Sequence, residues 1–179
     1  MRVITGICRG RKLLEPAGMD VRPTTDQVKE SLFNIIQFDV EGRRVLDLFA
    51  GTGQLGIEAL SRGAAECTFV DSARDSVRLV KENLKRCCLN ARVLQCDALG
   101  YLKTGEKYDL IFLDPPYGTG LDARAMEAVK EFDNLSKGGI MVCETRPDAV
   151  LPEFPAEYGS VRTYRYGKIK LTLVTRSVD

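Results

Sequence analysis

The glycine motif at residues 47–56 limits the folds open to this chain more than any other feature of the sequence. It contains the spacing G-x-G-x-x-G and consists of Asp47-Leu48-Phe49-Ala50-Gly51-Thr52-Gly53-Gln54-Leu55-Gly56. An apolar run (45–49) precedes the glycines, and apolar residues at helical spacing follow them, so the motif predicts a tight turn between a buried strand and a helix. Such a turn lets a ligand approach the backbone closely.

Strand and helix signals alternate along the rest of the chain. We predict further strands at 67–70, 91–96, 108–113 and 139–144, a closing hairpin at 158–166 and 168–175, and helices that begin near residues 24, 72 and 122. Repeated strand–helix units indicate an α/β fold with a Rossmann-like, mostly parallel sheet and helices on both faces. We expect one domain over residues 1–179, with a small basic hairpin or arm (1–22) and a Rossmann-like core (23–179).

Composition excludes several classes of chemistry. The 179 residues include no histidine, which removes Ser-His and Cys-His nucleophile pairs and the usual histidine-containing metal sites, so we expect no metal. The six cysteines lack C-x-x-C spacing and are predicted to be buried, reduced thiols. Because the chain has no run of 18 apolar residues and no signal-peptide core at its start, we expect a cytoplasmic protein without a membrane partner.

Three aspartates each follow a predicted strand. Asp71 comes 20 residues after Gly51, where a carboxylate can accept hydrogen bonds from a ribose diol. Asp47 would repel the pyrophosphate of a dinucleotide, but it suits the ammonium and sulfonium groups of S-adenosyl-L-methionine. Asp97 is positioned to accept a hydrogen bond from an adenine amino group. These acids favour S-adenosyl-L-methionine, while a nicotinamide-dependent oxidoreductase or a non-catalytic nucleotide-binding module remains an alternative.

A second motif, Asp114-Pro115-Pro116-Tyr117, follows the predicted strand at 108–113. Its prolines make a rigid turn with outward carbonyl acceptors. Asp114 and the Pro115 carbonyl could accept the hydrogens of an exocyclic base amine and return electron density to its nitrogen. Tyr117 could stack on an extruded base. The four residues are therefore candidate catalytic residues for direct methyl transfer to guanine N2 or adenine N6, and both motifs would face one cleft if their strands are neighbours.

Several segments together resemble the bacterial 16S ribosomal RNA guanine-N2 methyltransferase family over nearly the whole chain. They are 22–34 (an Arg-Pro-Thr segment leading into a helix), 47–53, 58–64, 114–117 and 166–168. The resemblance implies a seven-stranded methyltransferase domain with an N-terminal hairpin, which uses S-adenosyl-L-methionine to methylate guanine N2 in 16S ribosomal RNA. Adenine N6 of RNA or DNA is the alternative target. The implied partner is ribosomal RNA within an assembling small subunit, and we expect a monomer.

The resemblance also assigns site residues. The candidate cofactor-binding residues are Asp47, Phe49, Gly51, Gly53, Asp71, Ser72, Asp97, Ala98 and Asn34. The candidate RNA-binding residues are Arg2, Arg9, Arg11, Lys12, Arg22 and Thr24. Gln27 and Lys29 stand where many relatives are expected to carry arginine, and only Lys29 keeps the charge. The net charge is +1, but cations are concentrated in the first 22 residues and in the last stretch of the chain. This distribution fits either local surfaces that attract phosphate or two solvated edge segments.

Overall fold

The computed structural model describes residues 1–16 and 26–179, and its centre is a seven-stranded sheet. The strands lie in the order β3-β2-β1-β4-β5-β7-β6. Neighbours from β3 to β5 are parallel, and β7 runs antiparallel between β5 and β6. The strands are β1 (Arg44–Leu48), β2 (Glu66–Asp71), β3 (Arg92–Gln95), β4 (Tyr108–Leu113), β5 (Leu135–Thr145), β6 (Ser160–Tyr166) and β7 (Ile169–Thr175). The predicted mostly parallel α/β sheet with a C-terminal hairpin is confirmed.

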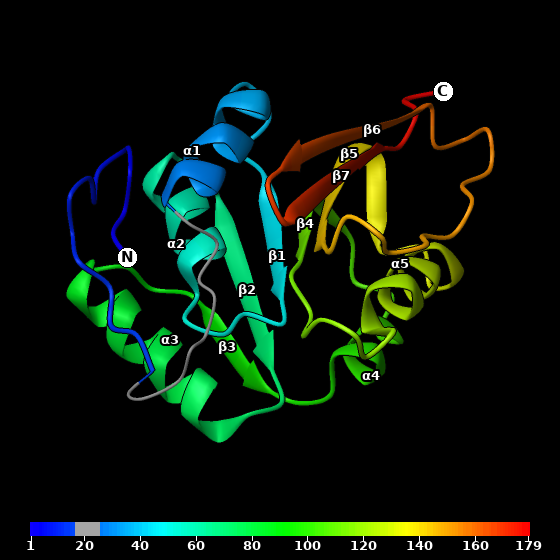
Figure 1. The fold of residues 1–179 in the computed structure, drawn as a ribbon. Helices are drawn as coiled ribbons and strands as arrows, with labels where there is room; N and C mark the ends of the chain where they lie inside the picture. The colour runs from blue at the N-terminus through cyan, green and yellow to red at the C-terminus, as the bar shows by residue number, and fades with distance from the viewer. Residues whose placement is uncertain (17–25) are drawn as a thin grey trace.

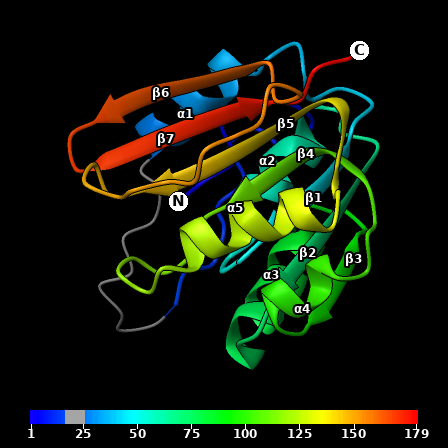
Figure 2. The same ribbon diagram turned by 90° about the vertical axis from the view of Figure 1, so that its right-hand side faces the viewer.

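Helices cover both faces of this sheet. They are α1 (Asp26–Ile35), α2 (Gln54–Ser61), α3 (Arg74–Arg86), α4 (Ala98–Leu102) and α5 (Leu121–Glu131). Figure 1 shows α1, α2 and α3 on one face, and Figure 2 shows α4 and α5 in front of the other. Because successive strand residues point to opposite faces, Phe112 packs in the core on the α1–α3 side, whereas Ile111 and Leu113 pack in the core on the α4–α5 side.

The structure differs from the sequence-based expectations at three places. Helix α4 was not predicted, because five residues are too few to show helical periodicity. Strand β5 begins at Leu135, earlier than the predicted residue 139. The helix predicted to begin near residue 72 begins at Arg74, and its N-cap residue is Ala73, whose N–H donates to Asp71 Oδ1 at 2.8 Å. The helix start predicted near residue 24 lies outside the described residues.

The N-terminal arm is packed against α2. Arg2 and Lys12 pair as an isolated antiparallel bridge, so the start of the chain folds back on itself. The Glu58 carboxylate of α2 accepts the N–H groups of Ile4 at 2.8 Å and Thr5 at 3.0 Å. Gly6 has φ +84°, and a Cβ there would lie 1.7 Å from the Ser61 carbonyl oxygen. Only glycine therefore allows the arm to approach α2 this closely.

A buried amide on α3 joins the arm to the glycine motif. Asn83 is fully buried. Its Nδ2 donates to the carbonyl oxygens of Leu14 at 3.2 Å and of Thr52 at 2.9 Å, while its Oδ1 accepts the Leu14 N–H at 2.7 Å. Because Thr52 lies between the first two glycines of the motif, the arm and the glycine turn share one side chain as a common support.

The cysteines follow the prediction only in part. All six are free, and Cys8, Cys67, Cys87 and Cys143 are buried. Cys96 is half-buried, and the prediction is wrong for Cys88, which is exposed. Cys88 follows the end of α3 with φ 54°, and this turn leaves its side chain outside the core while Cys87 packs inward. None of the helices in the described part of the chain is both long enough and apolar enough to span a bilayer.

Candidate functional site

The candidate residues gather where the strand order reverses. Strand β1 pairs with β2 on one side and with β4 on the other, and Leu48 is in register with both Val70 and Leu113. The residues that follow these three positions, among them Asp71 and Asp114, therefore lie along one edge of the sheet, the edge formed by the carboxyl ends of the parallel strands. The strands that carry the two motifs, β1 and β4, are neighbours, which is the condition under which the sequence predicts that both motifs face one cleft. In open α/β sheets this edge is where ligands bind.

The glycine turn presents an open stretch of backbone at this edge. Gly51 and Gly53 have φ values of +57° and +78°, a region that residues with a Cβ rarely adopt. A Cβ at Gly51 would meet no atom closer than the Phe49 carbonyl oxygen at 4.0 Å, so the space in front of the turn is free. The Gly51 N–H donates to Asp71 Oδ2 at 2.9 Å and fixes that carboxylate beside the turn. A cofactor that lies against the backbone requires this arrangement of open backbone beside a fixed carboxylate.

The ends of β2 and β3 bring further acceptors to the same edge. Asp71 is half-buried, with one oxygen bound to Gly51 and the other to Ala73, and it pairs in register with Gln95 two residues before Asp97. Asp97 is exposed, and its Oδ2 caps α4 by accepting the Gly100 N–H at 2.7 Å. Ser72 is exposed in the connection that follows β2, and Ala98 is buried at the start of α4.

Asp47 lies beneath the glycine turn. Its side chain is 2% exposed, and its Oδ2 accepts the Gly56 N–H at 2.9 Å. Burial, opposed by that hydrogen bond and reinforced by the negative charge of Asp71, raises the pKa of Asp47 to about 7. A cation placed at this edge would favour the ionised form. The prediction that Asp47 follows the first strand is wrong, because Asp47 lies within β1, in register with Phe69 and Phe112. Its support of α2 was also not predicted.

The Asp114-Pro115-Pro116-Tyr117 turn joins the edge next to a second carboxylate. Leu113 pairs with Cys143, so Asp114 and Glu144 follow neighbouring positions on β4 and β5. Tyr117 donates its hydroxyl hydrogen to Glu144 Oε1 at 2.7 Å, and Glu144 is 5% exposed. Burial, together with the charges of Glu144 and Asp47, holds the pKa of Asp114 well above its usual range.

Glu144 is the functional candidate that sequence reasoning missed. Glu144 is the last residue of the strand predicted at 139–144. An acid at the end of a predicted strand is close to the signal that selected Asp71 and Asp97, which directly follow predicted strands. What the sequence did not reveal is its partner, because Tyr117 and Glu144 are 27 residues apart. The hydrogen bond restricts the Tyr117 ring at the side of the Asp114 turn.

This edge can hold a flat ring that carries an amine. The Asp114 carboxylate and the Pro115 carbonyl are acceptors on a turn stiffened by two prolines. A carboxylate with a raised pKa is a stronger proton acceptor when ionised than one with an ordinary pKa. Among the described residues, no three His, Cys, Asp or Glu side chains are grouped as a metal site requires.

Four of the predicted RNA-binding residues lie on the arm. Arg2, Arg9, Arg11 and Lys12 are all exposed. Arg2 Nε lies 3.5 Å from Asp26 Oδ2, and Arg11 donates to the Arg86 carbonyl oxygen at 3.0 Å. The other two candidates, Arg22 and Thr24, lie outside the described residues.

Asn34 and Lys29, both on α1, do not lie at the carboxyl ends of the parallel strands, where the other candidate residues gather. Asn34 is exposed near the end of α1, and the chain leads from there toward the amino end of β1. The ring of its neighbour Phe33 lies 4.8 Å from the guanidinium carbon of Arg62, which follows the end of α2. Lys29 is fully buried; its amine donates to the Arg2 carbonyl at 2.5 Å and lies 3.9 Å from Glu58 Oε2. The charge that Lys29 retains is therefore internal, and burial lowers its pKa despite the opposing effect of Glu58.

Comparison with known proteins gives matches along the whole chain. A sequence model of the family described as Conserved hypothetical protein 95 matches residues 1–175. YlbH of Bacillus subtilis (strain 168), provisionally named an rRNA methyltransferase, is 43% identical over 173 residues, which are 93% of this chain and 94% of YlbH. Ribosomal RNA small subunit methyltransferase D of Escherichia coli (strain K12) is 35% identical over 181 residues, which cover 100% of this chain and 91% of that protein.

Solved structures share the fold. The structure of yhhF from Escherichia coli, provisionally named a methyltransferase, has a TM-score of 0.89 and 35% identity and covers 100% of this chain and 99% of its own. The 16S rRNA N2 G1207 methyltransferase RsmC of Thermus thermophilus, solved with AdoMet and guanosine, has a TM-score of 0.70 and 27% identity. That match covers 89% of this chain and 44% of RsmC.

Proposed function

The chain belongs to the family described as Conserved hypothetical protein 95, and on that premise we propose that it methylates the N2 amine of a guanine in 16S ribosomal RNA. It is an S-adenosyl-L-methionine-dependent methyltransferase of small-subunit ribosomal RNA. The observation that carries the proposal is the Asp114–Tyr117 turn beside the open glycine turn, at the reversal of strand order. RsmC, a 16S rRNA N2 methyltransferase of similar fold, supports guanine N2 as the target.

The cofactor fits the residues at this edge. S-adenosyl-L-methionine supplies a methyl group that is activated by a sulfonium cation. We assign its contacts to the backbone of Gly51 and Gly53, to Asp71 for the ribose, and to Asp97 with Ala98 for the adenine. Phe49 and Ser72 flank these groups along the chain. The buried Asp47 carboxylate lies beneath the position that we assign to this positively charged ligand. Burial makes the ionised form of Asp47 unfavourable and raises its pKa, and a cation nearby stabilises that ionised form.

The target amine is assigned to the Asp114 turn. Asp114 and the Pro115 carbonyl accept its two hydrogens and direct the nitrogen lone pair toward the methyl group. Tyr117, held by Glu144, provides a face on which the extruded guanine stacks, an interaction worth about 1–3 kcal/mol. Transfer would break the bond between the methyl carbon and the cofactor sulfur, leaving S-adenosylhomocysteine, and would form the N–C bond. The methylated amine would then be acidic, and the ionised Asp114 carboxylate would take its proton. Pro116 keeps the turn rigid, and the rate comes mainly from this positioning.

The RNA partner is assigned to the N-terminal arm. Its exposed cations Arg2, Arg9, Arg11 and Lys12 lie on a segment fastened to α2 and supported by Asn83 next to the glycine turn. We extend this contact to Arg22 and Thr24 because they stand in the Arg-Pro-Thr segment of the family. The natural substrate in this proposal is 16S RNA within an assembling small ribosomal subunit.

Methyl transfer from labelled S-adenosyl-L-methionine to small subunits that lack the modification tests the proposal, with nucleosides analysed afterwards. We expect label in N2-methylguanosine, and a loss of about 100-fold or more in kcat for Asp114→Asn. Asp109→Asn, on the same strand β4 but at its other end, is the matched control and should retain activity. Both variants should still bind S-adenosylhomocysteine. Label in N6-methyladenosine would overturn the guanine assignment, and label in no RNA would overturn the proposed activity.

A further inference from the structure

Helix α3 carries a row of cations that the proposed active site does not use. Arg74, Arg78, Lys81 and Lys85 are all exposed and are spaced by four, three and four residues. This spacing places them on one face of the helix. At 1.5 Å per residue the row is about 16 Å long. We call it the α3 row.

The α3 row is weakly neutralised. The helix contains five cations but only two carboxylates, although the whole chain has a net charge of only +1. Arg78 pairs with Asp75 at 3.3 Å, and both side chains are mostly exposed, so water and salt screen this pair. Within the described residues, the other three cations of the row form no ion pair within 4.0 Å. Positive charge therefore remains available along this face.

The position of the row connects two parts of the proposed site. Helix α3 begins three residues after Asp71, at the edge that carries the glycine turn. It ends at Arg86, whose carbonyl oxygen accepts a hydrogen bond from Arg11 of the arm. Figure 1 shows the arm and α3 side by side. The α3 row thus extends from the cofactor edge to the basic arm.

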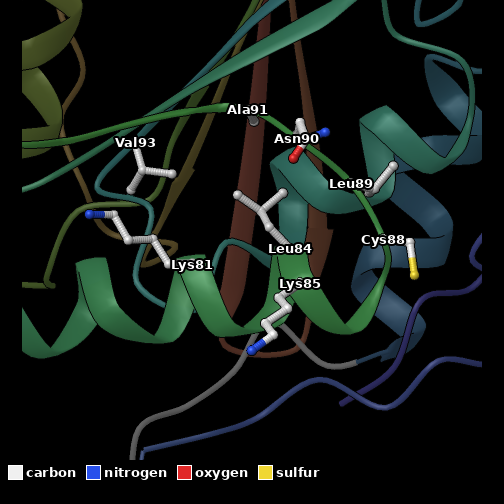
Figure 3. A pocket seen from close by; sticks show the side chains of 8 residues that line it. All are labelled: Lys81, Leu84, Lys85, Cys88, Leu89, Asn90, Ala91 and Val93. Atoms are coloured by element: carbon white, nitrogen blue, oxygen red, sulfur yellow. The ribbon is translucent and has the colours of Figure 1, made fainter.

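A groove runs along the side of the row. It lies between α3 and the segment that enters β3, has a volume of about 560 Å³, and is lined by Leu84, Leu89, Ala91 and Val93 together with Lys81 and Lys85. Figure 3 shows Lys81 reaching toward Val93, whereas Lys85 points away from β3. In the described part of the chain β3 is the edge strand of the sheet, and no further described strand covers this side.

We propose that the α3 row and its groove bind the phosphate backbone of the RNA that flanks the target nucleotide. This inference rests on the proposed function, which makes the substrate a polyanion. Cations clustered along one helix are the electrostatic footprint of a nucleic-acid contact. An RNA strand bound to the arm can continue along this row to the edge of the sheet that carries the glycine turn. The contact adds affinity that does not depend on the RNA sequence.

RNA binding by the Lys81→Gln/Lys85→Gln variant tests the inference directly, without requiring methyl transfer. The probe is a deproteinised 16S RNA fragment, and Kd is measured from 50 to 200 mM salt. We expect Kd to rise about tenfold at low salt, and the slope of log Kd against log salt to become shallower by roughly 1.5, for two lost phosphate contacts. Lys103→Gln/Lys137→Gln removes two exposed lysines elsewhere and should match the wild type.

Alkylation of Cys88 gives a second measurement on the wild-type protein. This exposed thiol lines the groove, and half-buried Cys96 serves as an internal reference. Bound RNA should slow alkylation of Cys88 more than that of Cys96. Unchanged Kd and salt slope in the lysine variant would overturn the inference. So would a defect that appears with ribonucleoprotein particles but not with deproteinised RNA, which would assign the surface to a protein. Failure of the methyl-transfer assay alone would overturn the proposed function and leave an RNA-binding defect as support for this surface.

Discussion

At the scale of single residues, Asp47 performs two tasks that oppose each other. Its carboxylate supports α2 through the Gly56 N–H, and it lies beneath the turn that we assign to a cationic cofactor. Burial makes its charge costly, which is why its pKa is raised to about 7. Without a cation nearby, ionising Asp47 therefore works against folding.

The sign of this effect gives a pH-dependence of stability. An aspartate with a folded-state pKa raised from 3.8 to about 7 contributes stability below pH 4, and this contribution is lost as the pH rises toward 7. Asp47→Asn has no such titration, although its amide oxygen can still accept the Gly56 N–H. Between pH 4.5 and 7.5, the unfolding free energy of the variant should therefore gain roughly 3 kcal/mol relative to the wild type. Urea unfolding at several pH values measures this difference.

The matched control for this prediction is Asp148→Asn, because Asp148 is an exposed aspartate away from the site edge. A difference between Asp47→Asn and the wild type that stays constant across this pH range would show that Asp47 ionises freely in the folded protein.

The sequence predicted the placement of some candidate residues where a simple rule applied. Acids at the carboxyl ends of parallel strands share an edge of the sheet, so the common position of Asp71, Asp97 and Asp114 could be predicted without a structure. Which of them binds cofactor or RNA remains a prediction. The Tyr117–Glu144 hydrogen bond and the burial of Lys29 were not predictable, because they depend on side chains brought together by tertiary packing from distant elements.

At the scale of elements, α2 links the two functional parts of the molecule. Its start follows the glycine turn, and its Glu58 holds the arm while lying 3.9 Å from the buried amine of Lys29. Glu58 is itself fully buried, and these partners, together with Arg62 at 2.8 Å, offset the cost of burying its carboxylate.

Removing the Glu58 carboxylate should release the arm. Glu58→Ala leaves two N–H groups of the arm and the Arg62 guanidinium without their acceptor, and the buried Lys29 amine without its counterion. We therefore expect a loss of about 3–5 kcal/mol in unfolding free energy. Replacing both members of the pair with apolar residues (Lys29→Met/Glu58→Leu) should recover part of that loss. Urea unfolding and limited proteolysis of the arm report the two effects.

An exposed ion pair provides the control for the Glu58 experiment. Glu66 pairs with Arg44, and both side chains are about half exposed. Glu66→Ala should change the unfolding free energy by no more than about 1 kcal/mol. A Glu58→Ala protein as stable and as protease-resistant as the wild type would contradict the assigned role of Glu58.

The order of strands and helices was predictable because long apolar runs and glycine turns alternate clearly. The boundaries of the elements were less predictable. The residues before 139 in β5 include Ser136, Lys137 and Gly138, which lack strand character. They lie in a register shift between the Leu135–Tyr108 and Ile140–Leu110 pairs, and Gly138 has φ +70°, so they form a bulge that strand periodicity does not reveal. Helix α4 depends on the Asp97 cap.

At the scale of the whole molecule, the sheet has two free edges, at β3 and β6. Within residues 1–16 and 26–179, strand β6 pairs with β7 alone, and it exposes Arg162, Arg165 and Val161 along its length. Like charges on an edge strand oppose pairing with a second copy, because two such edges would bring the arginines together.

We therefore expect a monomer of 19.9 kDa in solution. Light scattering after gel filtration measures this mass. Replacing the edge charges (Arg162→Val/Arg165→Val) should promote association, whereas Arg78→Val/Arg124→Val on the helices is the control and should remain monomeric. A wild-type dimer, or an edge variant that stays monomeric at high concentration, would contradict this explanation.

On the proposal that the arm binds RNA, the shared support at Asn83 would couple RNA binding to cofactor binding. Any shift of the arm that moves Leu14 acts on the amide that also holds Thr52 in the glycine turn. Because linked equilibria are reciprocal, the factor by which bound RNA changes cofactor affinity must equal the factor by which bound cofactor changes RNA affinity. One buried amide therefore lets the release of either product influence how tightly the other is retained.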